Sequence, residues 1–233
     1  MGYKEEFIEF MVRSQVLTFG EFVLKSGRIS PYFINTGLYR TGAQIAKLGE
    51  YYAACLMAQV KGGVNALYGP AYKGIPLVVS TATALFHQYQ LDIPYCFNRK
   101  ESKDHGEGGL IIGYQPADND HIVMIDDVTT AGTAMRENLP IIQSSAKAKV
   151  VALIISVDRM EKGTGHLSAV QQIRNDFGIN VYPIVTVRDI LDHLYGKKLE
   201  GKTVIDDIIK EKMEHYLKEY GALAIGERTE EED

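Results

Sequence analysis

The sequence predicts an α/β fold with a mostly parallel sheet flanked by helices, and a small hood at the N-terminal end. Between residues 64 and 187, short apolar runs alternate with amphipathic helical stretches. Strands that alternate with helices build parallel sheets that are buried on both faces. Polar turns that contain glycine follow several of these runs, and open α/β sheets bind ligands at that edge. Before residue 40 the pattern changes to short β-favouring runs that glycine and proline interrupt.

The N-terminal part contains an expected helix and a strand-and-turn unit. Apolar side chains recur at helical spacing over residues 3–14, which predicts an amphipathic first helix. The runs over residues 16–39 predict a strand-and-turn unit that caps the main core. Thr41 is of a residue type that favours the N-cap position, and helical periodicity follows it to about residue 60.

The rest of the chain supplies the sheet, its helices and a polar end. We expect strands at 64–68, 93–97, 121–125, 150–157 and 181–187, and helices at 75–89, 134–144 and 167–177. A last amphipathic helix carries Val204, Ile208, Ile209, Met213 and Leu217. The acidic end that follows it is expected to be disordered. The expected parts are an N-terminal helix and hood (1–40), a core with its C-terminal helix (41–221) and an acidic tail (222–233).

Composition and charge exclude several classes of protein. The 233 residues suit one large domain, and the contents of 45% hydrophobic and 24% charged residues are ordinary for a globular protein. A net charge of -5 argues against a broad nucleic-acid interface, which needs a surplus of lysine and arginine. No apolar run approaches the roughly 20 residues of a membrane span, and acidic residues interrupt the start where a secretory signal needs apolar ones. We therefore expect a cytoplasmic protein without nucleic-acid or membrane partners.

The most informative segment joins an apolar strand to a helix. The strand ends in Asp126 and Asp127, and a threonine–glycine turn leads to a helix that begins near Ala134. Glycine lets the backbone approach an anion closely, and a helix N-terminus offers free N–H groups. Paired carboxylates accept hydrogen bonds from vicinal ribose hydroxyls and can bias a magnesium ion through water. A lone carboxylate pair more often caps a helix, but the complete run predicts a sugar-phosphate site. The candidate residues of the turn are Val128, Thr129, Thr130, Ala131, Gly132, Thr133 and Ala134.

Two further polar loops follow predicted strands. Residues 69–74 connect a strand to a helix, a position that favours phosphate binding, but they lack the spacing of the nucleotide-binding glycine motifs. Residues 99–109 form a polar loop that ends in glycine. Most such charge clusters are solvated loops, but cations on a loop also suit a lid over a departing diphosphate. The cationic side chains of this loop are Arg99, Lys100, Lys103 and His105.

These loops resemble those of a known family. The segment 123–133 resembles the phosphoribosyl-pyrophosphate motif of type I phosphoribosyltransferases, which implies the fold of that family. Residues 69–74 resemble the family's pyrophosphate loop, which implies that Tyr72 and Lys73 contact the diphosphate. Residues 99–109 resemble the flexible catalytic loop, which implies a homodimer in which this loop acts in the neighbouring subunit's site. The implied catalytic residues are Lys100, Lys103, His105, Asp126 and Asp127.

The sequence of the hood indicates which group within this family the chain resembles. Residues 22–35, taken alone, are an amphipathic hairpin with one basic turn. They resemble the hood of orotate phosphoribosyltransferases, which implies that Phe33 stacks on a pyrimidine ring and that backbone near Ile34 bonds its edge. The same resemblance implies that Lys25 reaches the pyrophosphate or the reacting region, and that Thr130 approaches orotate.

Arg159 bears on the choice of acceptor base. It follows a buried strand, so a surface ion pair is its simplest role. In the family that the chain resembles, the arginine of this segment binds the orotate carboxylate, which a guanidinium suits by bidentate hydrogen bonding. The resemblance thus implies transfer of the 5-phosphoribosyl group from phosphoribosyl pyrophosphate to orotate, in pyrimidine biosynthesis. It also implies Mg²⁺ bound mainly through phosphoribosyl pyrophosphate, and no protein residue is assigned as a metal ligand.

Three alternatives remain open at this point. A purine phosphoribosyltransferase would share the phosphate motif, but purine bases have no carboxylate for Arg159 to bind. A non-catalytic regulator that senses phosphoribosyl pyrophosphate would fit less well with the loop lysines and the negative net charge. A diphosphokinase that makes phosphoribosyl pyrophosphate would need ATP-binding features that the sequence lacks.

Overall fold

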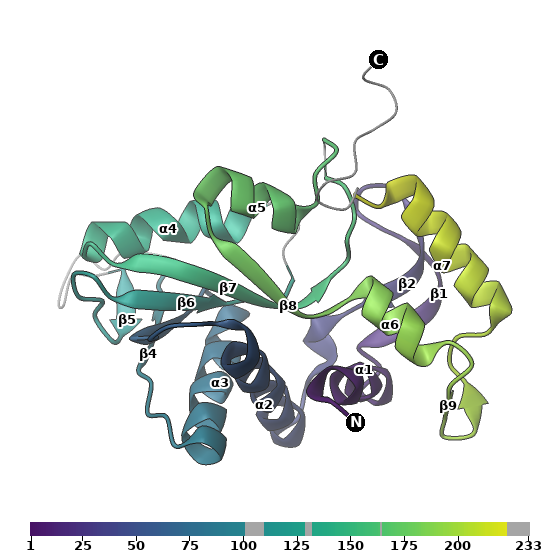
Figure 1. The fold of residues 1–233 in the computed structure, drawn as a ribbon, viewed down its shortest axis with the longest axis horizontal. Coiled ribbons are helices and arrows are strands. Elements are labelled where there is room, and N and C mark those ends of the chain that lie inside the picture. Colours follow the sequence, from purple (N-terminus) through teal and green to yellow (C-terminus); the bar gives the residue numbers. More distant parts are fainter. Residues whose placement is uncertain (101–109, 129–131, 164, 223–233) are drawn as a thin grey trace.

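A six-stranded sheet forms the centre of the computed structural model, which describes residues 1–100, 110–128, 132–163 and 165–222 (Figure 1). The strand order is β5-β4-β3-β6-β7-β8, and every neighbouring pair is parallel except β4 with β5. The predicted α/β fold is therefore confirmed. The parallel strands are β3 (Ala66–Gly69), β4 (Tyr95–Asn98), β6 (His121–Ile125), β7 (Lys149–Asp158) and β8 (Asn180–Thr186).

Helices cover both faces of this sheet (Figure 1). Thr41 caps the first of them in a capping box with Gln44, as its residue type predicted. Ser168 forms a second capping box, with Gln171. The helices α2 (Gly42–Gln59) and α3 (Gly74–Tyr89) cover one face, and α4 (Thr133–Ser145) and α5 (Ala169–Phe177) cover the other.

Alternation along the strands divides the core into two buried clusters. In β3, Leu67 belongs to the cluster under α2 and α3, whereas Tyr68 belongs to the cluster under α4 and α5. In β6, Val123 and Met124 divide between the two clusters in the same way. All four side chains are fully buried. A parallel sheet covered on both faces needs such apolar runs, and it leaves polar groups only at the strand ends.

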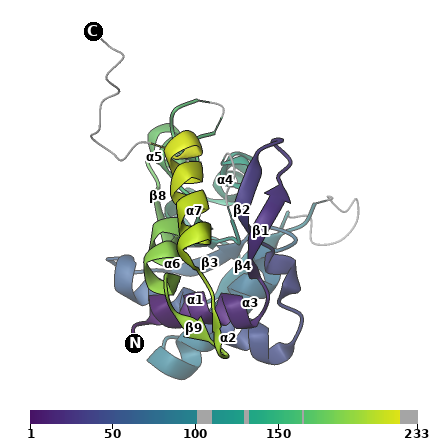
Figure 2. The ribbon, with the colours of Figure 1, turned by 90° about the vertical axis from the view of Figure 1, so that its right-hand side faces the viewer.

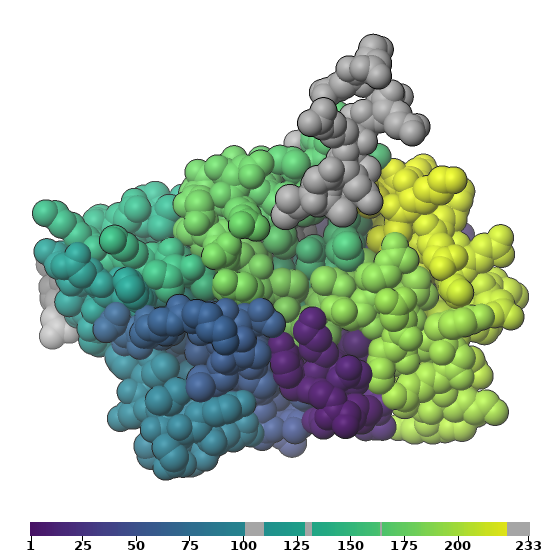
Figure 3. Space-filling view, viewed as in Figure 1, coloured from purple at the N-terminus to yellow at the C-terminus, as the bar shows by residue number. Residues whose placement is uncertain are grey.

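The hood is a two-stranded antiparallel ribbon of β1 (Leu17–Val23) and β2 (Ile29–Ile34), beside α1 (Tyr3–Arg13) and the short 3-10 helix η1 (Thr36–Leu38). The C-terminal helix α7 (Asp207–Tyr220) packs beside the ribbon (Figure 2). The ring of Tyr216 meets that of Tyr32 edge-on at a centroid distance of 6.0 Å. Figure 3 shows α1 between α2 and the segment of α6 at the surface. Buried residues of α1 and the ribbon share a cluster with α2, and the division of the chain near residue 40 stays a prediction.

Several elements differ from the sequence expectation. The chain adds an antiparallel edge strand, β5 (Ile111–Gly113), a helix, α6 (Val187–Leu194), and a small hairpin of β9 (Lys198–Leu199) and β10 (Lys202–Thr203). Val187 begins α6 rather than ending a strand, because Thr186 forms a capping box with Asp189. Val204 lies before the last helix, which Asp206 caps at its start. None of the helices among the described residues is long and apolar enough to cross a membrane.

Candidate active site

An acidic pair, Asp126 and Asp127, stands at the carboxyl end of β6, and hydrogen bonds with two elements, α2 and β7, hold its backbone. The amide of Asp126 donates to the carbonyl of Ile154 at 3.0 Å. The hydroxyl of Tyr52, on α2, donates to the carbonyl oxygen of Asp126 at 2.7 Å. Ser156, on β7, donates from its amide at 2.8 Å and from its hydroxyl at 2.6 Å to the carbonyl oxygen of Asp127. Because Tyr52 and Ser156 are buried, the backbone that carries the two carboxylates is held in a fixed position.

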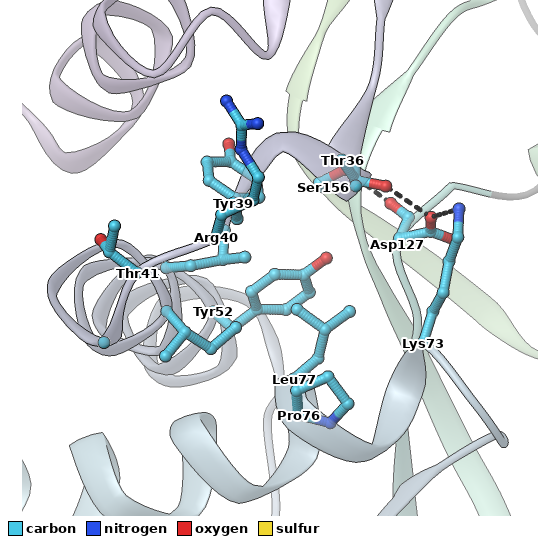
Figure 4. A pocket seen from close by; sticks show the side chains of 14 residues that line it. Thr36, Tyr39, Arg40, Thr41, Tyr52, Lys73, Pro76, Leu77, Asp127 and Ser156 are labelled. Carbon is cyan, nitrogen blue, oxygen red and sulfur yellow. Dashed lines mark hydrogen bonds and ion pairs between the residues drawn. The ribbon is translucent and has the colours of Figure 1, made fainter.

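The side chain of Asp127 meets two partners from distant parts of the sequence (Figure 4). Its Oδ2 accepts hydrogen bonds from Lys73 Nζ at 2.7 Å and from the Thr36 hydroxyl at 2.8 Å. The Lys73 side chain is 68% exposed, while that of Asp127 is 13% exposed. The lysine therefore reaches in from solvent to the carboxylate, and the structure brings two sequence-predicted site residues into contact.

Asp126 titrates abnormally. Burial of its carboxyl group, and next the neighbouring charge of Asp127, raise the pKa of Asp126 from 3.8 to about 7. The amide of Asp127 donates to Asp126 Oδ1 at 2.8 Å, which opposes the shift. Near neutral pH the pair therefore carries fewer than two negative charges, and the protonated form of Asp126 can donate a hydrogen bond.

The turn after the pair leads into α4 through Gly132. This residue has φ of 68° at the N-cap position, a left-handed conformation that glycine adopts without strain. A Cβ atom there would lie 3.1 Å from Cγ1 of Ile173, so the position is also crowded. Thr133 begins α4, one residue before the expected Ala134. The predicted ligand residues Thr129, Thr130 and Ala131 lie outside the described residues.

The loop of residues 69–74 is tight and joins the same edge of the sheet. A Cβ atom on Gly69 would lie 2.3 Å from the carbonyl oxygen of Gly74, so only glycine fits the turn. The amide of Ala71 donates to Asn98 Oδ1 at 2.7 Å, which ties the loop to the end of β4. The peptide bond between Ala71 and Tyr72 is cis.

The loop of residues 99–109 starts beside the loop of residues 69–74. Lys100 Nζ lies 5.0 Å from the ring centroid of Tyr72, within cation–π range. The amide of Arg99 donates to the carbonyl of Leu110 at 2.7 Å, which closes the base of the loop. Lys103 and His105 lie outside the described residues.

In the hood, the residues implied for base binding differ in exposure. Phe33 is 37% exposed and stacks on Phe22 at a centroid distance of 5.4 Å. Ile34 is half-buried and packs against the core. Lys25 is exposed in the turn between β1 and β2. Phe33 is therefore the side chain of β2 that offers a ring to a ligand.

Arg159 forms an ion pair that is mostly buried. Its Nε donates to Glu161 Oε1 at 2.8 Å, and its NH2 lies 2.6 Å from the same oxygen. The guanidinium carbon lies 4.6 Å above the ring centroid of Tyr32. Strand alternation places Tyr32 and Phe33 on opposite faces of β2, so Arg159 lies over the face that Phe33 does not share.

A cavity of about 440 Å³ adjoins the acidic pair. It lies between η1, the start of α2 and the start of α3, with Asp127 and Lys73 on one side (Figure 4). Thr36, Tyr52 and Ser156 also line it, and sequence reasoning missed all three in this role. Tyr52 lies within the helix predicted after Thr41, where nothing in the sequence marks its hydroxyl, and the other two carry no motif. Among the described residues, no cluster of three or more His, Cys, Asp or Glu side chains could hold a metal ion.

Comparisons with known proteins agree with this geometry. The phosphoribosyl transferase domain family matches residues 36–184. The chain is 50% identical over 222 residues to an orotate phosphoribosyltransferase of Lachnoclostridium phytofermentans, covering 95% of this chain and 99% of that protein. It is 49% identical over 221 residues to one of Clostridium botulinum strain Alaska E43, covering 95% and 99%.

A solved structure is similar as well. The crystal structure of an orotate phosphoribosyltransferase from Francisella tularensis superposes with a TM-score of 0.81 at 40% identity, covering 93% of this chain and 100% of that one. Sequence, fold and the arrangement at the end of β6 therefore agree, and the chain belongs to the orotate phosphoribosyltransferases, within the phosphoribosyl transferase domain family.

Proposed function

We propose that the protein transfers the 5-phosphoribosyl group of phosphoribosyl pyrophosphate to orotate, giving orotidine 5'-monophosphate and pyrophosphate. The observation that carries this proposal is the fixed acidic pair, Asp126 and Asp127, between Lys73 and the turn that enters α4. The carboxylates accept hydrogen bonds from the ribose hydroxyls, and the start of α4 receives the 5'-phosphate with Val128, Gly132, Thr133 and Ala134. Thr129, Thr130 and Ala131 complete that turn.

Lys73 has a second role when the substrate binds. Its ammonium group pairs with Asp127 at 2.7 Å, and its side chain is largely exposed, so it can turn to an anion at little cost. A diphosphate beside the acidic pair supplies that anion, and ribose hydroxyls then take the place of Lys73 on the carboxylate. Tyr72, the neighbour of Lys73 in the sequence, has Lys100 of the same subunit over its ring at 5.0 Å.

The reaction is a displacement at the anomeric carbon. N1 of orotate forms the new bond as the carbon–oxygen bond to the diphosphate breaks, the bonding electrons leave with the diphosphate, and the N1 proton is released to the diphosphate or to solvent. Negative charge therefore grows on the leaving group, and fixed cations stabilise the transition state more than the ground state. Lys73 serves this role together with Arg99, Lys100, Lys103 and His105 of the loop that the neighbouring subunit supplies, and Lys25 of the hood reaches the pyrophosphate or the reacting region.

The base lies against the hood. The exposed ring of Phe33 stacks on the pyrimidine, and backbone near Ile34 bonds its edge. Arg159 receives the carboxylate substituent through its guanidinium N–H groups. This arrangement favours an acidic pyrimidine over a purine.

Magnesium fits this site through the substrate. Mg²⁺ usually keeps waters and takes phosphate oxygens with one or two carboxylates. Asp126 and Asp127 provide carboxylates beside the diphosphate position, which suits contact through water. When bound, the ion supplies charge that neutralises the departing diphosphate.

We also propose a homodimer in which residues 99–109 of each subunit act in the neighbouring site. Two observations support an active site completed from outside: Lys73 and Tyr72 are each 68% exposed. A site that must exclude water around an oxocarbenium-like centre needs a cover over these side chains.

One assay tests the proposed function. The protein is mixed with orotate, phosphoribosyl pyrophosphate and Mg²⁺, and the pyrimidine absorbance is followed, with adenine, hypoxanthine and uracil offered as alternative acceptors. We expect turnover when orotate is the acceptor and none with the other three bases. Turnover with adenine or hypoxanthine in place of orotate would instead support a purine phosphoribosyltransferase.

A further inference from the structure

Glu161 lies between two arginines at the junction of the hood and the core. Its Oε1 takes the ion pair with Arg159, and its Oε2 lies 3.7 Å from NH1 of Arg28. The side chain of Glu161 is 14% exposed, and those of Arg159 and Arg28 are 16% and 22% exposed. Ion pairs that are this well shielded from water are strong only when their geometry is good. The three side chains therefore form a fixed group, which we call the Glu161 bridge.

The bridge occupies only one edge of the Arg159 guanidinium. Glu161 Oε1 accepts from Nε and approaches NH2, which together form the side edge of the planar group. A guanidinium carries five N–H donors, so the edge formed by NH1 and the second hydrogen of NH2 is left. Among the described residues, the Ser30 hydroxyl lies 3.4 Å from NH2, and the buried hydroxyl of Tyr216 also interacts electrostatically with this guanidinium. The long contact with Ser30 is weak, and a carboxylate oxygen would replace it readily.

The plane of the guanidinium is fixed as well. Arg159 lies over the ring of Tyr32, which is fully buried in β2. The hydroxyl of Tyr32 donates to Glu161 Oε1 at 3.1 Å, so the same residue supports both the arginine and its partner. Orientation and plane are thus set before any ligand arrives, which lowers the entropic cost of binding.

The charges of the bridge leave room for one anion. Arg28 and Arg159 carry two positive charges, and Glu161 carries one negative charge. Arg28 also donates to the carbonyl of Lys162 at 3.1 Å, which fixes the end of the hood turn to the core. The neighbouring Asp158 accepts from the amide of Met160, and its pKa is raised because it is buried. Within the Glu161 bridge itself one positive charge remains, which a monocarboxylate at the open edge of Arg159 would balance.

We propose that Glu161 is the positioning residue of the base-binding arginine: it holds the side edge of Arg159 and presents the other edge to the carboxylate of the base. Through Arg28 it also joins this arginine to the hood turn that carries Lys25. The inference rests on the proposed role of Arg159 in binding orotate. It adds that selectivity for an acidic base depends on a carboxylate of the protein as well as on the arginine.

The test compares ligands that differ by one carboxylate. Orotidine 5'-monophosphate and uridine 5'-monophosphate are titrated by calorimetry into the wild type and into Glu161→Ala, and the KM values of both substrates are measured. We expect Glu161→Ala to weaken the binding of orotidine 5'-monophosphate and to raise the KM of orotate by about 10-fold or more. The affinity for uridine 5'-monophosphate and the KM of phosphoribosyl pyrophosphate should change by less than about 2-fold. Glu161→Gln, which keeps an oxygen acceptor for Nε, should recover part of the loss.

Other results would overturn the inference. An unchanged or lower KM for orotate in Glu161→Ala would mean that Glu161 is idle or competes with the substrate. Equal weakening of both nucleotides would mean a general structural role. Glu219→Ala serves as the control, because Glu219 is an exposed carboxylate of α7 that pairs with His215, and we expect it to behave as the wild type.

Arg159→Ala separates this inference from the proposed function. If Arg159→Ala raises the KM of orotate and Glu161→Ala does not, the role of Glu161 fails and that of Arg159 stands. If neither variant changes the KM of orotate, the assignment of the base site fails, and the inference fails with it.

Discussion

Asp126 is the residue whose protonation the structure changes most clearly within the site. Its folded pKa of about 7 lies above the ordinary 3.8, so the folded protein binds a proton that the unfolded chain releases between these values. The proton's contribution to stability is therefore fully present below about pH 4 and is lost as the pH rises through about 7. Above that pH, the buried carboxylate repels Asp127 and lacks full hydration.

Asp126→Asn tests this shift through stability. The asparagine side chain is neutral at every pH, so we expect the Tm of the variant to rise relative to that of the wild type as the pH increases from about 5 to about 8. Thermal unfolding followed by circular dichroism at several pH values measures the difference. A Tm difference that stays constant across this range would show that Asp126 titrates normally.

The catalytic role of Lys103 is a prediction that rests on the family resemblance alone. A cation that stabilises the departing diphosphate acts mainly in the transition state, so its loss lowers kcat. We expect Lys103→Ala to reduce kcat by roughly 100-fold or more in steady-state assays. Lys198→Ala, on the exposed β9, is the control. Unchanged turnover in Lys103→Ala would remove this lysine from the catalytic residues.

At the scale of elements, α2 supports the site from beneath. Tyr52 crosses from the helix to the end of β6 and donates to the carbonyl oxygen of Asp126 at 2.7 Å. The ring of Tyr52 is fully buried, so another donor to the carbonyl oxygen of Asp126 would have to occupy the same place as its hydroxyl. The packing of one helix therefore fixes the backbone from which both carboxylates project.

Tyr52→Phe removes only that hydroxyl. The carbonyl oxygen of Asp126 then loses a buried donor, which costs about 1–3 kcal/mol of unfolding free energy. We expect the KM of phosphoribosyl pyrophosphate to rise several-fold, because the carboxylates lose their fixed position, while the KM of orotate changes less. Tyr51→Phe is the matched control, since Tyr51 precedes Tyr52 on α2 and its ring packs against Phe7 and Phe10 of α1. Equal effects of the two variants would contradict this role of Tyr52.

Sequence patterns predicted the long elements and missed the short ones for physical reasons. The parallel strands are apolar runs with both faces buried, so their composition alone marks them. The three-residue β5 and the two-residue β9 have no measurable period. The predicted strand to residue 187 ends one residue earlier, because Thr186 caps the start of α6 and so prevents the strand from continuing.

At the scale of the whole molecule, the site is partly readable from sequence. The carboxylates and glycine at the end of β6 form a local motif, so the sequence could predict Asp126, Asp127 and Gly132 as site residues through its family resemblance, and their role stays a prediction. The contact of Thr36 with Asp127 joins residues 91 positions apart, and that of Tyr32 with Glu161 joins residues 129 apart. Such contacts exist only after the hood packs on the core. The support of the site therefore required a structure, whereas its main chemical groups did not.

The role of the acidic pair in binding the substrate is tested most directly by calorimetry. Phosphoribosyl pyrophosphate with Mg²⁺ is titrated into the wild type and into Asp127→Asn. The exchange keeps the shape of the side chain but removes the charge that Lys73 and Thr36 contact. We expect saturable binding to the wild type and an affinity at least about 10-fold lower for the variant, with circular dichroism confirming that both are folded. Equal affinity of the two proteins, or the absence of binding heat with the wild type, would contradict the claim that the acidic pair holds the ribose of this substrate.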